Sequence, residues 1–367
     1  MKFKIAFIGA GSLIFTRTLF TDIMSVPEFR DIDIAFTDIS EDNLKKVTDL
    51  CQRDLEANGI ATKIQSTLDR REAFQDARYI INCVRIGGLE GFETDIEIPL
   101  KYGVDQCVGD TLCIGGIMYG QRVIAAMLDF CKDIREVAAP GAVMLNYSNP
   151  NAMATWACNK YGKVKTIGLC HGEIHGEQQI AEVLGIPRDE LDFVCAGINH
   201  QTWYISISHH GESMLQKLLP AFEAHETYRE EEKVRIDILK RFGYYSTESN
   251  GHLSEYVAWY RKRPDEIKDW IDLSRWIHGE TGGYLRVTRE ECARLIKKQR
   301  EVFGSGYRKK PQNMTRTAAL RFRNTQKRSR ANKNRIQPTG TPRTRNVSPG
   351  RFLFENLSFS QVKSRRK

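Results

Sequence analysis

Four residues near the N-terminus have the types and spacing of a dinucleotide-binding turn. Gly9, Gly11 and Ser12 follow the apolar run of residues 4–8 at once, and Asp38 closes a second apolar run. Glycines allow the tight turn after a strand, and the free N–H groups of the next helix bind a pyrophosphate. An acid at the second strand end accepts hydrogen bonds from a ribose and repels a 2′-phosphate. The pattern therefore indicates NAD rather than NADP.

This fingerprint is incomplete when taken alone. The third glycine position of the usual GxGxxG pattern is occupied by Ile14. A GxG turn between a strand and a helix is also found where it is only structural, or where it binds another nucleotide.

A cysteine and a histidine could hold a metal ion. Cys170 lies in GLCHG and His200 ends AGINH, and both follow expected strand ends. A thiolate and an imidazole can ligate a divalent ion that keeps open positions for substrate oxygens. One Cys and one His are not a complete metal set, so a core cysteine and a hydrogen-bonded loop histidine remain the alternative.

Further polar residues lie near the expected strand ends. Asn149 stands in MLNYSNP, Asp110 and Thr111 precede an expected helix, and Arg85 follows a strand. Each has a structural explanation, since Asn-Pro makes turns and Asp-Thr caps helices. Residues at the carboxyl ends of parallel strands meet at one edge of a sheet, where such folds bind ligands. We therefore expect these side chains near one cleft.

Apolar runs and helical patterns alternate through the first half of the chain. Helices are expected in most of the gaps, notably over residues 120–137. Alternating strands and helices predict an α/β fold, a Rossmann-like doubly wound parallel sheet followed by a mixed α+β substrate domain. The expected strands cover residues 4–8, 32–36, 63–67, 77–84, 142–147 and 166–169.

Length and composition restrict the class of protein. The 367 residues are 41% hydrophobic and 28% charged, enough for two domain-sized cores. No stretch reaches the roughly 18 apolar residues that span a bilayer, and no signal-peptide pattern precedes the first strand, so we expect a cytoplasmic protein without a membrane span. The nine cysteines form no CxxC pair and indicate buried small side chains rather than a disulfide framework.

The positive net charge is confined to the end of the chain. Residues 308–367 contain 18 Lys or Arg and one acid, so the first 307 residues carry −8 of the total of +9. An acidic body with a basic tail argues against a nucleic-acid-binding domain, although binding through the tail remains an alternative.

Ordered motifs over some 300 residues resemble a known family, the NAD- and metal-dependent glycosidases of glycoside hydrolase family 4, in its α-galactosidase branch. The motifs are FIGAGS, IGG with DIEIPLKYG, GDT with GGI, MLNYSNP, GLCHG, AGINH, FGYYSTES and GHLSEY. The nucleotide domain of this family is related to lactate and malate dehydrogenases, so a 2-hydroxy-acid dehydrogenase is the natural competitor.

The resemblance implies roles for particular residues. Cys170 and His200 match the family's ligands for a divalent cation, usually Mn²⁺. Asn149 matches a sugar contact near the oxidised carbon, and Asp110 a position near the nicotinamide and sugar. Tyr256, in the SEY motif, is the best match to a tyrosine base. The residues that match the NAD site are Gly9, Gly11, Ser12 and Asp38.

The implied activity is hydrolysis by oxidation, elimination, addition and reduction. NAD⁺ takes a hydride from C3 of the sugar, the C2 proton becomes acidic beside the ketone, and a base removes it. The aglycone leaves C1, water adds, and the hydride returns to C3. The family is therefore an exception to the two-carboxylate glycosidase mechanism.

The sugar specificity has conflicting signals. His171 resembles the branch that acts on unphosphorylated α-glycosides, whereas Gly172 and Glu173 depart from the Ser-Val usual in α-galactosidases and resemble α-glucuronidases. Arg85 resembles the 6-phospho branch or has a structural role. We expect a small α-galactoside as substrate, with α-glucuronidase or α-galacturonidase as the alternatives.

Three segments are expected. Residues 1–170 form the NAD-binding domain, residues 171–304 form an incomplete substrate and metal domain, and residues 305–367 form a basic, disordered tail. A change of reading frame near residue 305 is our interpretation of the tail, with a genuine nucleic-acid or localisation tail as the alternative. Relatives form homo-oligomers through their ordered continuation, so this altered C-terminus makes assembly and activity doubtful.

Overall fold

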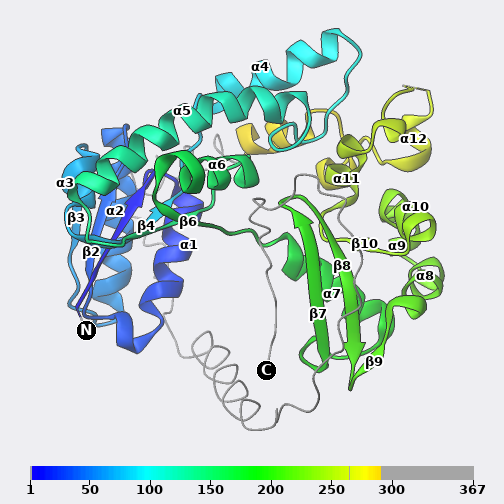
Figure 1. Ribbon diagram of the computed structural model, residues 1–367, viewed down its shortest axis with the longest axis horizontal. Helices are drawn as coiled ribbons and strands as arrows, with labels where there is room; N and C mark the ends of the chain where they lie inside the picture. The colour runs from blue at the N-terminus through cyan, green and yellow to red at the C-terminus, as the bar shows by residue number, and fades with distance from the viewer. Residues whose placement is uncertain (1, 264, 291–367) are drawn as a thin grey trace, which may run out of the picture.

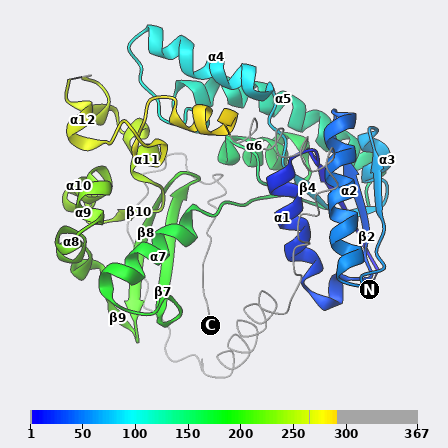
Figure 2. The same ribbon diagram turned by 180° about the vertical axis from the view of Figure 1, so that it is seen from behind.

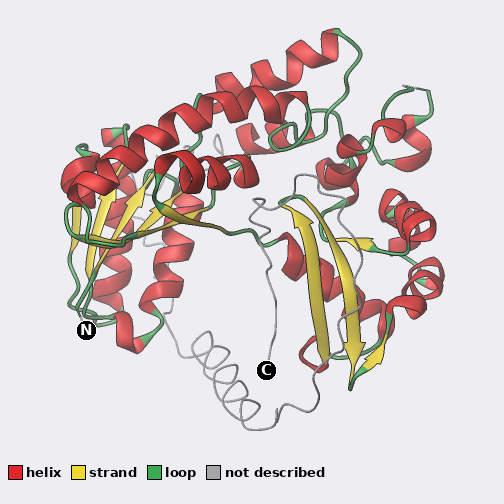
Figure 3. Cartoon of the chain, in the orientation of Figure 1, coloured by secondary structure: helices red, strands yellow, loops and turns green. Residues whose placement is uncertain are grey.

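The computed structural model describes residues 2–263 and 265–290, which contain two sheets with their covering helices (Figures 1 and 3). The first sheet has six parallel strands in the order β3-β2-β1-β4-β5-β6. Its strands are β1 (Lys4–Ile8), β2 (Asp33–Thr37), β3 (Ile64–Thr67), β4 (Ala77–Asn82), β5 (Val143–Asn146) and β6 (Lys165–Gly168).

Helices cover both faces of this sheet, so its central strands are buried on both sides. Alternate residues of β1 enter different cores: Ile5 and Phe7 pack with α1 and α2, whereas Ala6 and Ile8 pack with α3, α5 and α6. This explains why the strand is a continuous apolar run. The helices are α1 (Leu13–Met24), η1 (Pro27–Phe29), α2 (Glu41–Ala57), α3 (Arg70–Phe74), α4 (Gly88–Lys101), α5 (Ile114–Val137), α6 (Asn151–Ala157) and η2 (Cys158–Gly162).

A smaller antiparallel sheet follows in the order β10-β8-β7, with β9 paired to β8. Its main core joins the sheet to α7, α8 and α10, and includes Tyr204, Phe222 and Tyr245. The strands are β7 (Leu191–Ile198), β8 (Gln201–His209), β9 (Glu212–Ser213) and β10 (Tyr245–Ser246). The other elements are α7 (Gly172–Leu184), η3 (Arg188–Glu190), α8 (Leu215–Ala224), α9 (Tyr228–Glu231), α10 (Lys233–Phe242), α11 (Asn250–Tyr256), η4 (Ala258–Tyr260), α12 (Ile267–Trp270) and η5 (Trp276–His278).

The two sheets stand on either side of the molecule, and α4 and α5 run above the space between them (Figures 1 and 2). The chain leads from the end of β6 toward this space, and the turn between β7 and β8 lies at its edge (Figure 1). The arrangement confirms the expected Rossmann-like sheet followed by a smaller mixed domain.

All six expected strands are present, with ends shifted by one or two residues. The helix expected from residue 120 begins earlier, at Ile114. Its first turn contains Gly116, where an added Cβ would lie 2.3 Å from the backbone carbon of Thr111. The glycine at this position is therefore required by a close approach of two backbone segments.

The two expected domain boundaries remain predictions, and the expected tail lies outside the described residues. The divisions at residues 170 and 304 are not tested by the geometry, and the tail of residues 305–367 is not among the described residues. Within residues 2–263 and 265–290, no helix combines the length and the apolar character needed to cross a membrane.

We predict that Gly116→Ala lowers the free energy of unfolding by at least about 2 kcal/mol, because the new methyl group must displace backbone atoms. Urea denaturation followed by circular dichroism would measure this change. Gly91→Ala in α4 is the matched control: its Cβ meets only the flexible end of Arg122, at 3.3 Å. The control should lie within about 1 kcal/mol of the original chain, and equal losses in both variants would contradict the packing explanation.

Candidate active site

The turn from β1 into α1 has the geometry of an anion-binding turn. Gly9 has a φ of 79°, and an added Cβ would lie 2.9 Å from the backbone carbon of Cys83, so only glycine fits there. Ser12 is the N-cap of α1, yet its side chain makes no capping hydrogen bond. The first N–H groups of this helix are therefore free to bind a phosphate.

Asp38 lies beside this turn, directly after β2. Its carboxylate accepts hydrogen bonds from the Gly11 N–H at 2.8 Å and from the Ser40 N–H at 2.9 Å. An added Cβ at Gly11 would lie 2.9 Å from the same carboxylate. The structure thus brings together Gly9, Gly11, Ser12 and Asp38, as the sequence predicted.

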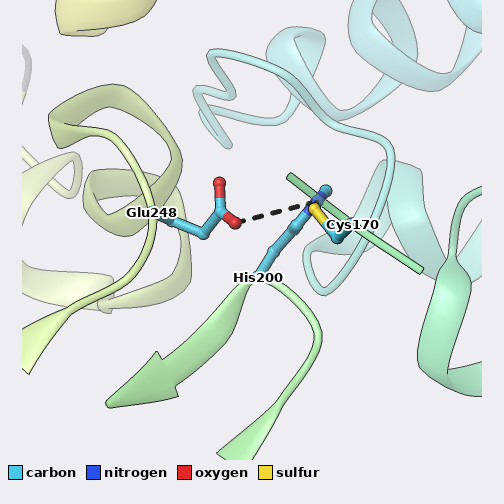
Figure 4. A group of neighbouring side chains, drawn as sticks. All are labelled: Cys170, His200 and Glu248. Atoms are coloured by element: carbon cyan, nitrogen blue, oxygen red, sulfur yellow. Dashed lines mark hydrogen bonds and ion pairs between the residues drawn. The ribbon is translucent and has the colours of Figure 1, made fainter. Parts of the chain in front are cut away.

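Cys170 and His200 come from different units of the chain but meet in space (Figure 4). Cys170 follows β6 and precedes α7, and His200 lies in the tight turn between β7 and β8 with a left-handed φ of 65°. The Cys170 Sγ lies 3.4 Å from the His200 Nε2. Cys170 is exposed, which contradicts the alternative that it is a core residue.

Glu248 is the third member of this cluster (Figure 4). Its Oε1 lies 4.0 Å from the His200 Nε2, and the ligand atoms of Cys170, His200 and Glu248 all lie within 4.8 Å of one another. Burial opposes ionisation of Glu248, but the charge of His200 holds its pKa below the usual value. Burial likewise opposes protonation of His200, but Glu248 and Cys170 raise its pKa to about 10.

Asp110 is the centre of a second, adjoining group. Its carboxylate accepts hydrogen bonds from Arg85 at 3.2 Å, Asn149 at 3.1 Å and the Thr111 hydroxyl at 2.7 Å. Burial favours the protonated acid, but Arg85 and then His200 hold the pKa of Asp110 below its usual value. Asp110 is therefore a buried, ionised carboxylate whose Oδ2 orients the Asn149 amide.

Thr111 joins the two groups. Its Oγ1 lies 2.7 Å from the Asp110 Oδ1 and 2.9 Å from the His200 Nδ1. An ionised carboxylate can only accept, so the single hydroxyl proton is donated to Asp110 and the His200 Nδ1–H donates to Thr111. This arrangement directs the Nε2 of His200 toward Cys170 and Glu248.

Tyr256 is the last residue of α11. Its ring centroid is 6.4 Å from that of His252, and its hydroxyl is buried with no hydrogen-bond partner among the described residues. Burial, Glu255 and Asp110 raise its pKa well above the usual value. The phenol is therefore neutral in this environment, and work as a base would require a nearby positive charge.

Two cavities adjoin these residues. A cavity of about 290 Å³ is lined by Cys170, His200 and Glu248 together with parts of α6, β7 and β8. A second cavity of about 470 Å³ has an aromatic lining that includes Trp203, Phe242 and Trp259. Tyr256 lines the second cavity rather than the first.

The sequence analysis did not assign roles to Glu248, His252 or the hydroxyl of Thr111. Glu248 and His252 lie four residues apart at the start of α11 and flank its N-cap, Ser249, whose hydroxyl lies 2.8 Å from the His252 Nδ1. Burial lowers the pKa of His252 to about 4, so it is neutral. The STES and GHLSEY motifs contain both residues, but nothing in their spacing reveals that Glu248 lies beside Cys170 and His200.

A parallel dinucleotide-type sheet, joined to a small antiparallel domain with a Cys-His cluster between them, defines a nucleotide- and metal-binding enzyme class. The family 4 glycosyl hydrolase model matches residues 4–186, and the C-terminal domain model of the same family matches residues 195–339. The chain belongs to glycosyl hydrolase family 4. The second match passes residue 305, so the similarity extends farther than the motifs alone indicated.

Two curated relatives are α-galactosidases. The chain is 63% identical over 290 residues to that of Rhizobium meliloti and 34% identical over 261 residues to that of Bacillus subtilis. These matches cover 79% and 71% of this chain. The chain spans 59% and 60% of the lengths of the two relatives.

A solved 6-phospho-α-glucosidase from gut microorganisms, in complex with NAD and glucose-6-phosphate, has the same fold. It superposes with a TM-score of 0.68 at 25% identity, covering 86% of this chain and 71% of its own. The family match and the fold therefore agree with the resemblance to family 4 glycosyl hydrolases.

Glu255 should make the stability of the fold depend on pH. It accepts hydrogen bonds from the N–H groups of Val108 and Gly109, at 2.8 and 3.1 Å, and burial raises its pKa from 4.5 to about 7. Between these values the folded chain holds a proton that the unfolded chain releases. The stabilisation is therefore full at acid pH and is lost as the pH rises through about 7.

We predict that the original chain loses roughly 2 to 3 kcal/mol of unfolding free energy between pH 5 and pH 8 because of Glu255, and that Glu255→Gln does not show this loss. Urea denaturation at the two pH values would measure the difference. Glu212→Gln, at an exposed position of β9, is the control and should leave the pH dependence unchanged. The same pH dependence in Glu255→Gln and the original chain would rule out Glu255 as its source.

Proposed function

We propose that this protein hydrolyses α-galactosides with NAD and a divalent cation, of which Mn²⁺ is the expected one. The observation that carries the proposal is the exposed Cys170 thiol facing His200, beside the Asp110 and Asn149 pair. The 63% identity to an α-galactosidase supports the choice of sugar.

The residues of the β1–α1 turn fit NAD. The glycine-only turn and the uncapped α1 leave room and N–H donors for a pyrophosphate, and Asp38 supplies the carboxylate for a ribose. Gly9, Gly11, Ser12 and Asp38 would hold the cofactor. When the ribose binds, the Asp38 carboxylate would exchange one of its two hydrogen bonds to backbone N–H groups for hydrogen bonds from the ribose hydroxyls.

The second group fits a divalent transition ion. A thiolate and an imidazole nitrogen 3.4 Å apart have the spacing of two ligands on one ion, and the adjoining cavity leaves room for sugar hydroxyls. When bound, NAD accepts and returns a hydride, and the cation polarises neighbouring sugar oxygens so that a carbon-bound proton becomes acidic.

The side chains of this protein would bind and orient the sugar. Asn149 gives one amide proton to Asp110, which leaves its other N–H and its carbonyl oxygen for a sugar hydroxyl. Thr111 fixes the ring of His200. Tyr256 is the proposed base: a nearby positive charge would lower its pKa so that the hydroxyl loses its proton, and the resulting phenolate oxygen, which has no hydrogen-bond partner among the described residues, would take the proton from the sugar carbon.

The surroundings of Arg85 support an unphosphorylated substrate. Its guanidinium donates to Asp110 at 3.2 Å and stacks on the ring of Phe92, 4.3 Å from the centroid. A group engaged in this way balances the buried Asp110 rather than offering a free cation to a phosphate.

A cytoplasmic location and assembly into a homo-oligomer stay predictions.

We expect the full chain to release nitrophenol from p-nitrophenyl α-galactoside only when NAD⁺, Mn²⁺ and a thiol reductant are all present. Chelation should abolish release and Mn²⁺ should restore it, with no net NADH absorbance, since the hydride returns to the sugar. Nitrophenyl α-glucuronide, α-glucoside and a 6-phosphate form the comparison panel. Activity without nicotinamide would overturn the mechanism, and preference for the uronide would overturn the choice of sugar.

Thr111→Val should weaken Mn²⁺ binding by about 10- to 100-fold, because His200 loses the partner that orients it. Titration of free Mn²⁺ by electron paramagnetic resonance would measure the dissociation constant. Thr111→Ser keeps the hydroxyl and should bind Mn²⁺ nearly as the original chain does. If the serine and valine variants bind equally weakly, the methyl group rather than the hydrogen bond is what matters.

A further inference from the structure

Glu248 is a buried carboxylate that accepts no hydrogen bond from the described residues. Its side chain is 9% exposed and lines the cavity beside Cys170 and His200. The two histidine nitrogens that face it among residues 2–263 and 265–290, His200 Nε2 and His252 Nδ1, each lie 4.0 Å away, which is beyond hydrogen-bond distance. Buried charges are normally paired closely or bound to a metal, so this group lacks a partner that the cavity has space to hold.

The two histidines do not donate a hydrogen bond to this carboxylate. His252 Nδ1 lies 2.8 Å from the Ser249 hydroxyl, and His200 Nδ1 lies 2.9 Å from the Thr111 hydroxyl. The remaining His200 nitrogen, Nε2, faces both the Cys170 sulfur and the Glu248 carboxylate (Figure 4). Three atoms of different elements therefore point at one small volume.

The spacing of these three atoms is that of ligands on one ion. Atoms that each lie about 2.0 to 2.3 Å from a shared ion are roughly 3 to 4 Å apart. Here Sγ to Nε2 is 3.4 Å and Nε2 to Oε1 is 4.0 Å. All three lie within 4.8 Å of one another.

Gly172 makes the approach of Glu248 possible. A Cβ at this first residue of α7 would lie 2.1 Å from the Glu248 Oε1. The departure from the usual α-galactosidase motif at Gly172 therefore opens the space that this carboxylate oxygen occupies. A glycine two residues after Cys170 and a glutamate that fills the space of its missing side chain therefore form a matched pair.

We propose that Glu248 is a third protein ligand of the divalent cation, with Gly172 as the residue that admits it. This inference rests on the proposed function, which needs only Cys170 and His200. A thiolate and a carboxylate together balance the two charges of the ion, and the mixed sulfur, nitrogen and oxygen set favours Mn²⁺, Fe²⁺ or Co²⁺ over Mg²⁺. Positions on the ion remain open for two sugar oxygens.

The test measures metal binding on the full chain rather than activity. Glu248→Gln should weaken Mn²⁺ binding by on the order of 100-fold. Loss of a direct ligand should cost at least as much affinity as loss of a residue that only hydrogen-bonds to a ligand. Gly172→Ala should show a loss in the same direction, because its methyl group displaces the carboxylate. Glu173→Gln, which changes a carboxylate on the same cavity without touching the cluster, is the matched control and should bind normally.

Co²⁺ absorption provides a second measurement. In Glu248→Gln saturated with Co²⁺, the thiolate charge-transfer band should persist, because Cys170 still binds, while the weaker visible bands change with the lost ligand. If Glu248→Gln binds Mn²⁺ as the original chain does while His200→Ala does not, Glu248 is not a ligand. If the original chain binds no divalent ion, both this inference and the metal in the proposed function fail.

Discussion

The hydrogen bonds of the Thr111 hydroxyl connect the two halves of the site. This one group bridges the Asp110 carboxylate, on the loop before α5, and the His200 ring, in a turn of the other sheet. Both ends are buried, and the Thr111 hydroxyl gives the His200 Nδ1–H its acceptor while it donates to Asp110. The position of α5, the turn between β7 and β8, and the orientation of Asn149 all have to agree with this contact.

The sequence predicts the first sheet well because its signals are local. A strand buried on both faces is a continuous apolar run, and the turn after β1 needs glycine for a reason that lies within the turn and the adjacent strand. The start of α5 is harder to predict, since Gly115 is required by the backbone of Asp95 in α4, whose carbonyl oxygen would lie 2.8 Å from an added Cβ. Tertiary contact overrides local propensity there.

The residues of the candidate site can be predicted only in part from the sequence. Cys170 and Asp110 stand near predicted strand or helix ends, so topology alone suggests that they meet. Glu248 and the base candidate Tyr256 come from the loop before α11 and from α11 itself, whose placement depends on the packing of the second core. Their motifs suggest importance, but not which of them faces the Cys170 cavity; the structure separates Glu248, on that cavity, from Tyr256, on the neighbouring one.

The contact between Gly172 and Glu248 links two positions that are far apart in the chain. Any residue with a Cβ at position 172 would occupy the volume that the Glu248 oxygen now fills. A substitution at one position is therefore acceptable only with a change in the path or identity of the other side chain. Among relatives, the two positions should covary, and a protein that carries serine at position 172 has to hold its glutamate in a different rotamer.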